Sequence, residues 1–143
     1  MDDKLNVFID TNVLIDYLAR REPFFTAAAL VIQLGQRRKC NLLVSSLSFA
    51  TTSFILQAHH KMFHDAIIDK FKRFIQICNV TPIDSQTVVE SLLSTFDDFE
   101  DAMQYFSALR ENADIIITRN KPDYTKSQLP VYEPQEFIDI LLQ

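Results

Sequence analysis

Acidic residues occur in this chain at positions where several of them could bind one metal ion. Asp10 ends the apolar run 7–9, which is typical of a buried strand in a parallel sheet. Asp98 and Asp101 lie three residues apart in an acidic stretch and would share one helix face. Asp123 follows a second apolar run, 114–118. Carboxylates that converge without basic partners repel one another, and a hard divalent cation such as Mg²⁺ or Mn²⁺ relieves that repulsion.

The acids can meet only if the segments that carry them end at one edge of the fold. Mainly apolar runs predict short strands at 7–9, 42–45, 80–83, 114–118 and 130–132. Apolar residues at helical spacing predict helices at 11–18, 24–38, 49–60, 62–78, 85–94, 96–112 and from 134 onward. Strands that alternate with helices pair in parallel through right-handed crossovers. The predicted fold is a three-layer α/β/α domain with a short, mainly parallel central sheet.

Local signals predict where some of these elements begin and where they lie. Pro23 suits the first position of the second helix, and Ser46 or Ser48 is expected to cap the third. Pro82 cannot donate a ladder hydrogen bond, so the strand at 80–83 is expected at an edge of the sheet.

In a parallel sheet the carboxyl ends of the strands lie along one edge, where ligands bind. Asp10 follows the strand at 7–9, and Asp123 follows the strand at 114–118. Asn120 lies between that later strand and Asp123. A helix that returns along the sheet begins near the same edge, so Asp98 and Asp101 can face Asp10. A metal ion held there can activate water and neutralise a phosphodiester during hydrolysis.

The composition limits the classes of protein to which the chain can belong. Its 143 residues, 48% hydrophobic and 23% charged, suit one globular domain over residues 1–143. No apolar run approaches the roughly 18 residues that span a membrane, and the polar start and two distant cysteines predict a cytoplasmic protein. The net charge of −5 argues against nucleic-acid binding through backbone charge alone. With Gly35 as the single glycine, no glycine-rich phosphate loop can form.

Each acid also has an interpretation that needs no metal. Asp10 could serve only as the N-cap of the next helix, and Asp97, Asp98 and Glu100 could complement a helix dipole. Asp123 could be a solvated loop acid. A phosphoryl-transfer or receiver-type domain that uses Asp10 covalently is a further alternative, and it predicts a lysine after a later strand and a tight acidic pair beside the first.

Three motifs together resemble the PIN-domain ribonucleases, a family that includes the toxins of VapBC toxin–antitoxin pairs. They are the opening run 7–12 (VFIDTN), the central segment 98–108 (DFEDAMQYFSA) and the closing segment 115–124 (IIITRNKPDY). The resemblance covers nearly the whole chain. It implies a parallel sheet between helices, a Mg²⁺- or Mn²⁺-dependent endoribonuclease and RNA as substrate. It also implies a small antitoxin protein, or a second copy of the chain, as a candidate partner.

The resemblance also implies roles for individual residues. Asp10, Asp101 and Asp123 would be the catalytic acids that bind the metal. The supporting residues would be Thr11 and Asn12, which orient Asp10, and Thr118 and Asn120, which form the far wall of the site. Two cations flank this site and could contact RNA, namely Arg119 and Lys121.

One position departs from the family pattern. The family usually places a glutamate early in the helix after the second strand, whereas the matching residue here is Thr51. A threonine can hold a metal-bound water but brings no charge, and Asp98 is a candidate for the missing ligand. The alternative function is therefore a degenerate PIN-like domain that binds nucleic acid or protein with weak or no nuclease activity.

Overall fold

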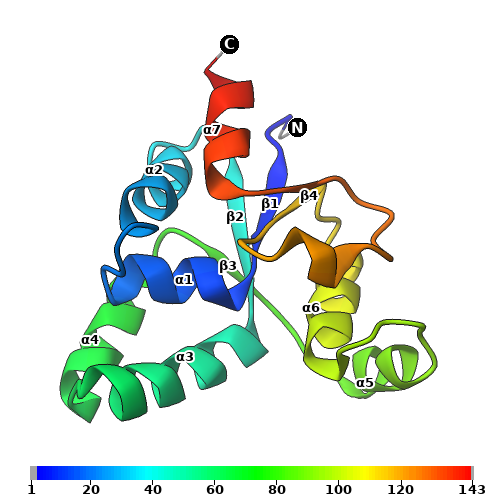
Figure 1. Cartoon of the computed structure of the whole chain (residues 1–143), viewed down its shortest axis with the longest axis horizontal. Coiled ribbons are helices and arrows are strands. Elements are labelled where there is room, and N and C mark those ends of the chain that lie inside the picture. The colour runs from blue at the N-terminus through cyan, green and yellow to red at the C-terminus, as the bar shows by residue number, and fades with distance from the viewer. Residues whose placement is uncertain (1–2, 143) are drawn as a thin grey trace.

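The computed structural model describes residues 3–142, and these residues form a sheet of five parallel strands (Figure 1). The spatial order is β3-β2-β1-β4-β5, so β1 is central. Phe8 on β1 pairs with Leu43 on β2 and with Ile116 on β4. The five predicted strands are confirmed, with bounds β1 (Asn6–Ile9), β2 (Asn41–Ser45), β3 (Asn79–Thr81), β4 (Ile115–Ile117) and β5 (Val131–Tyr132).

Helices cover both faces of this sheet. Figure 1 shows α1, α2 and α7 on one side and α5 and α6 on the other. This arrangement confirms the predicted three-layer α/β/α fold. The helices of the described residues are α1 (Thr11–Leu18), α2 (Phe25–Gln36), α3 (Ser46–His60), α4 (His64–Phe74), α5 (Ser85–Leu92), α6 (Phe99–Arg110) and α7 (Pro134–Leu141), with a short 3₁₀-helix, η1 (Lys121–Tyr124).

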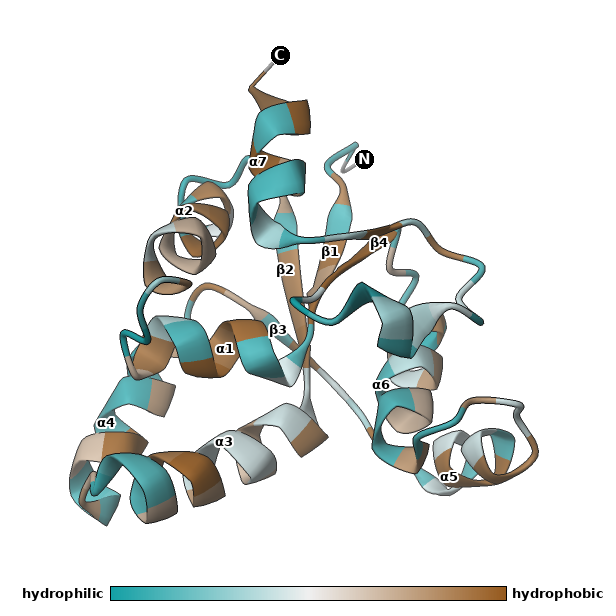
Figure 2. Ribbon diagram, viewed as in Figure 1, coloured by the Kyte–Doolittle hydropathy of each residue, from teal (hydrophilic) through white to brown (hydrophobic). Residues whose placement is uncertain are grey.

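The central strands are buried on both faces. On β1, Val7 and Ile9 pack into the larger core with α1, α2 and α7, whereas Phe8 packs into the smaller core with Tyr105 and Ala108 of α6. The same alternation holds on β4, and Figure 2 shows hydrophobic residues along both strands. Full burial of such a side chain contributes about 1.5–3 kcal/mol. The core therefore fixes the end of β1, where Asp10 is the N-cap of the next helix.

Several predicted boundaries are wrong by a few residues. The third helix begins at Ser46 because its cap is Ser45, whose hydroxyl accepts the Ser48 N–H at 3.1 Å. The second helix begins at Phe25 with Phe24 as its N-cap, so Pro23 lies outside it. The fourth helix ends at Phe74, because the chain must extend to pair β3 with β2 from residue 79.

The edges of the sheet agree with the sequence. β3 and β5 are the two outer strands, and Pro82 follows directly after β3. Among residues 3–142, no helix is long and apolar enough to cross a membrane. The cytoplasmic location stays a prediction.

Candidate active site

Asp10 is a buried carboxylate between β1 and α1. The residue is 6% exposed, and it does cap α1, because its Oδ1 accepts the Thr11 N–H at 2.8 Å. Its Oδ2 accepts a second hydrogen bond from the Thr118 hydroxyl, also at 2.8 Å. Burial raises the pKa of Asp10, and hydrogen bonds from Thr118, Thr11 and Gln104 oppose that rise. The capping role and a role in the site are therefore compatible.

Asp101 lies in the first turn of α6, half-buried and facing other acids. Burial and the negative charge of Asp10 raise its pKa to about 7, and the charges of Asp98, Asp123 and Glu100 add to the rise. Among the charged neighbours, Asp10 has the largest effect. The start of α6, the end of β1 and the η1 segment thus meet at one place, as the topology predicted.

The η1 segment contributes Asp123 and Tyr124 to this place. Tyr124 is fully buried, and its hydroxyl makes no hydrogen bond of ordinary geometry with the described residues. That hydroxyl nevertheless lies close enough to Asp10 to stabilise the carboxylate form. Burial, together with the charges of Asp10 and Asp101, raises the pKa of Tyr124 well above its usual value. The phenol therefore keeps its proton and presents a polar group to the acids.

Asn12 links Asp10 to the loop that follows β4. Its Nδ2 donates to Asp10 Oδ2 at 3.3 Å and to Thr118 Oγ1 at 3.2 Å. Asn120 donates its backbone N–H to Thr118 Oγ1 at 3.1 Å. Thr118, Thr11 and Asn12 thus each donate a hydrogen bond to the Asp10 carboxylate. The roles that the resemblance implies for them stay predictions.

Among the described residues, the charges that act on Asp101 are those of other acids, namely Asp10, Asp98, Asp123 and Glu100. The ion pairs between described residues involve other acids, namely Asp16, Asp69, Asp84, Glu90 and Glu136. In the part of the chain that the structure describes, no three acidic, histidine or cysteine side chains are close enough to enclose a metal ion. The donor set of carboxylates, amides and hydroxyls is the one that Mg²⁺ and Mn²⁺ prefer. The half-buried position of Asp101 among other negative charges, which raises its pKa, fits a cation at this place.

Comparison with known proteins identifies the fold family. The family model of the PIN domain matches residues 6–122. The chain belongs to the PIN-domain family. It is similar to Ribonuclease VapC1 of Aquifex aeolicus (strain VF5), with 25% identity over 138 residues, 93% of each chain.

Solved structures also resemble this PIN domain. One is FitAB bound to the IR36 DNA fragment, with a TM-score of 0.69 and 12% identity over 90% of this chain and 94% of the other. Another is a toxin–antitoxin complex from Klebsiella pneumoniae, with a TM-score of 0.65 and 19% identity over 90% and 97%. At these identities the similarity concerns the fold.

One residue that contacts Asp10, Gln104, was not predicted from the sequence. Gln104 lies on α6, one turn after Asp101, and is almost fully buried. Its Nε2 contacts Thr11 Oγ1 at 2.9 Å, Ser48 Oγ at 2.7 Å and Asp10 Oδ1 at 3.4 Å, while its Oε1 accepts a hydrogen bond from Ser45. The spacing of three residues from Asp101 puts both on one helix face, which was the available signal.

In this PIN domain, Thr51 faces an acid of another helix. Its hydroxyl donates to Glu100 Oε1 at 3.2 Å, so a carboxylate of α6 lies next to Thr51, the residue expected to match the family's glutamate. Asp98, the predicted substitute ligand, is the N-cap of α6, and its Oδ1 accepts the Asp101 N–H at 2.9 Å. Glu100 therefore has a closer contact with this position than Asp98.

Both predicted RNA-contacting cations have acidic partners. Arg119 pairs with Asp16, with 2.6 Å between Nε and Oδ2, and Lys121 pairs with Glu136, with 3.1 Å between Nζ and Oε1. Asp16 is fully buried and also pairs with Arg21, and sequence reasoning missed it. RNA contacts by Arg119 and Lys121 stay predictions.

Proposed function

We propose that this PIN domain is a metal-dependent endoribonuclease. The observation that carries the proposal is the place of Asp101, half-buried beside the negative charges of Asp10, Asp98 and Asp123. Burial and these charges together raise the pKa of Asp101 to about 7. Asp16, by contrast, is paired with two arginines of the chain, Arg21 and Arg119. The name of the similar VapC1 protein, a ribonuclease, supports the same activity.

Asp10, Asp101 and Asp123 would hold Mg²⁺ or Mn²⁺ in this site. The bound ion would supply an acidified water and positive charge for phosphodiester hydrolysis. The residues of the chain have defined tasks around it. Thr118 and Asn12 orient Asp10 Oδ2, and Thr11 and Gln104 hold Oδ1, so the carboxylate is fixed before substrate arrives. Such fixed outer contacts set the orientation of metal ligands.

The direct test is RNA cleavage across metal concentrations. The wild-type protein should cut a fluorescent RNA in Mg²⁺ or Mn²⁺ and lose that activity in excess EDTA. Asp101→Asn should abolish most of the cleavage, because it removes one ligand charge. RNA binding without any cleavage in either metal would contradict the proposal and favour the degenerate binding domain that the threonine at position 51 suggests.

We further propose that a small antitoxin protein is the partner. One structural neighbour is the toxin–antitoxin complex from Klebsiella pneumoniae, which supports this class of partner. Phe54 is 64% exposed and Phe63 is 84% exposed, which leaves apolar surface on the α3–α4 side. A second copy of the chain stays a predicted partner.

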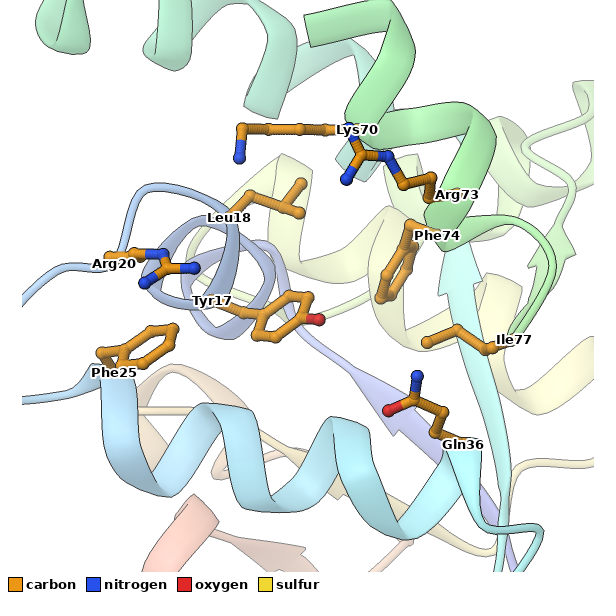
Figure 3. A pocket seen from close by; sticks show the side chains of 9 residues that line it. All are labelled: Tyr17, Leu18, Arg20, Phe25, Gln36, Lys70, Arg73, Phe74 and Ile77. Atoms are coloured by element: carbon orange, nitrogen blue, oxygen red, sulfur yellow. The ribbon is translucent and has the colours of Figure 1, made fainter. Parts of the chain in front are cut away.

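A cavity of about 280 Å³ lies next to α1, α2 and α4 (Figure 3), and we propose that a segment of this partner binds there. Apolar and positively charged side chains line it together, so it fits a peptide segment with an apolar side chain beside a carboxylate. Its main lining residues are Tyr17, Phe25, Phe74, Arg20, Lys70 and Arg73.

Growth tests this toxin role. Expression of the wild-type chain alone should slow cell growth, and expression of Asp10→Asn at the same level should not. Normal growth with a folded and active wild-type enzyme would instead indicate a nuclease that needs no antitoxin.

A further inference from the structure

The loop that follows β4 carries two side chains of the proposed site, Thr118 and Asp123. Arg119 lies between them in the sequence, but its side chain contacts α1 and the segment before α2. It was expected to contact RNA, yet most of its guanidinium is engaged within the protein. The contacts of Arg119 therefore bear on how this loop is held.

The guanidinium of Arg119 is fixed by an acid and an aromatic ring. Its Nε donates to Asp16 Oδ2 at 2.6 Å and its Nη2 to Asp16 Oδ1 at 3.3 Å, so the pair is bidentate. The guanidinium carbon lies 3.9 Å from the centre of the Phe24 ring, a distance at which cation–π attraction is favourable. Asp16 is fully buried, so its orientation is set by the packing of α1.

The backbone of Arg119 is tied to the site itself. Its N–H donates to Asn12 Oδ1 at 3.1 Å, while Asn12 Nδ2 contacts Asp10. The next residues continue this anchoring, since the Asp123 N–H donates to the Asn120 carbonyl at 3.0 Å. A fixed Arg119 therefore fixes where η1 begins and, through it, where Asp123 lies relative to Asp10.

We propose that Arg119 is a positioning residue, which acts through Asp16 and Phe24 to hold the 118–124 loop in the geometry of the site. The part of this proposal that concerns metal affinity rests on the proposed nuclease function. The part that concerns the loop does not.

Arg21 offers a matched control for the test. It pairs with the same acid, with 2.7 Å between its Nε and Asp16 Oδ1, and its Nη2 donates to the Asn12 carbonyl at 3.4 Å, but it lies between α1 and α2 and not on the loop. Arg119→Met and Arg21→Met each remove one cation from Asp16. If these arginines only neutralise a buried charge, the two variants should behave alike.

Amide hydrogen exchange of the metal-free protein tests the loop directly. Arg119→Met should accelerate exchange at residues 118–124 at least about tenfold, whereas Arg21→Met should leave that segment unchanged. Arg119→Lys keeps the charge but loses the bidentate pair, so its exchange rate at residues 118–124 should lie between those of wild type and Arg119→Met. It takes the place of Arg119→Met in the test if that variant does not fold. Equal exchange in the Arg119 and Arg21 variants would overturn the proposal.

Mn²⁺ binding and steady-state kinetics test the consequence for the site. Arg119→Met should lower Mn²⁺ affinity and kcat by about 10–100-fold, the range for residues that orient metal ligands, with KM for RNA nearly unchanged. A raised KM with unchanged kcat and Mn²⁺ affinity would overturn the proposal and make Arg119 an RNA contact. If wild type binds no Mn²⁺, the nuclease function fails, and the exchange result alone decides the loop proposal.

Discussion

Asp10 and Asp16 lie six residues apart, one at each end of the same short helix, and their surroundings are opposite. Asp16 is paired with two arginines. Among the described residues, the hydrogen-bond donors to Asp10 include Thr11, Asn12, Gln104 and Thr118, which are neutral, and its charge acts on another acid, Asp101. A buried carboxylate is costly to keep charged unless a cation meets it. The protein provides that cation for Asp16, whereas for Asp10 we propose that a metal ion from solution supplies it.

The largest expected effect is a difference in folding stability between the Asp16 and Asp10 variants. Asp16→Asn should lower the free energy of unfolding by about 3–5 kcal/mol, because it leaves two arginines without their buried partner. Asp10→Asn should change it far less, or raise it, because it relieves repulsion with Asp101. Urea unfolding of the metal-free proteins measures both, with the exposed Asp139→Asn as control. An equal loss of unfolding free energy in Asp10→Asn and Asp16→Asn would contradict the difference proposed between the two acids.

A second prediction concerns activity. Asp101→Asn should lower RNA cleavage by about 100-fold or more, since even outer residues that orient a ligand cost about 10–100-fold. Glu100→Gln, its neighbour in the sequence, should have a smaller effect because Glu100 contacts Thr51 rather than Asp10. Initial rates at saturating Mn²⁺ measure this difference. A larger loss of cleavage rate in Glu100→Gln would indicate that the metal binds nearer to Thr51.

The pH dependence of stability gives a third prediction. The pKa of Asp101 is about 7 in the folded protein, against an ordinary value of 3.8. Between these values the folded state holds a proton that the unfolded state has lost, so stability without metal should fall as pH rises from about 4 to 7. Asp101→Asn should flatten this slope. Melting temperatures at a series of pH values test it, and an identical slope in both proteins would show that Asp101 is not the group responsible.

The smallest expected effect concerns position 51. Thr51→Glu alone would place a second carboxylate against Glu100, so the useful variant combines it with Glu100→Gln. We expect the double variant to raise Mg²⁺-dependent cleavage about fivefold, which corresponds to about 1 kcal/mol of transition-state stabilisation. Cleavage of one RNA by both proteins across Mg²⁺ concentrations measures it. An unchanged rate would mean that Glu100 already supplies the missing charge.

Most of the fold was predictable because local patterns determined it. The apolar runs on β1 and β4 have no polar face, which is typical of strands buried on both sides, and the cores bury them in that way. The carboxyl-edge rule for parallel sheets also predicted that Asp10 and Asp101 would meet. Their meeting depends on topology, which the order of strands and helices already determines.

The contacts around the site were less predictable. Asp16 and Arg119 are 103 residues apart, and nothing local distinguishes them from solvated surface charges. The same holds for Gln104, whose neighbours come from β2, α1 and α3. Such contacts depend on how elements pack side by side. The sequence indicated that these elements would be neighbours, but not which polar side chains would pair.

The most direct test of the central claim is Mn²⁺ titration calorimetry on wild type, Asp10→Asn and the exposed control Asp139→Asn. If the acids around Asp10 form a metal site, wild type and the control should bind Mn²⁺ with equal affinity, and Asp10→Asn should bind at least about tenfold more weakly, because a ligand charge is lost. Equal Mn²⁺ affinity in wild type and Asp10→Asn would contradict the claim.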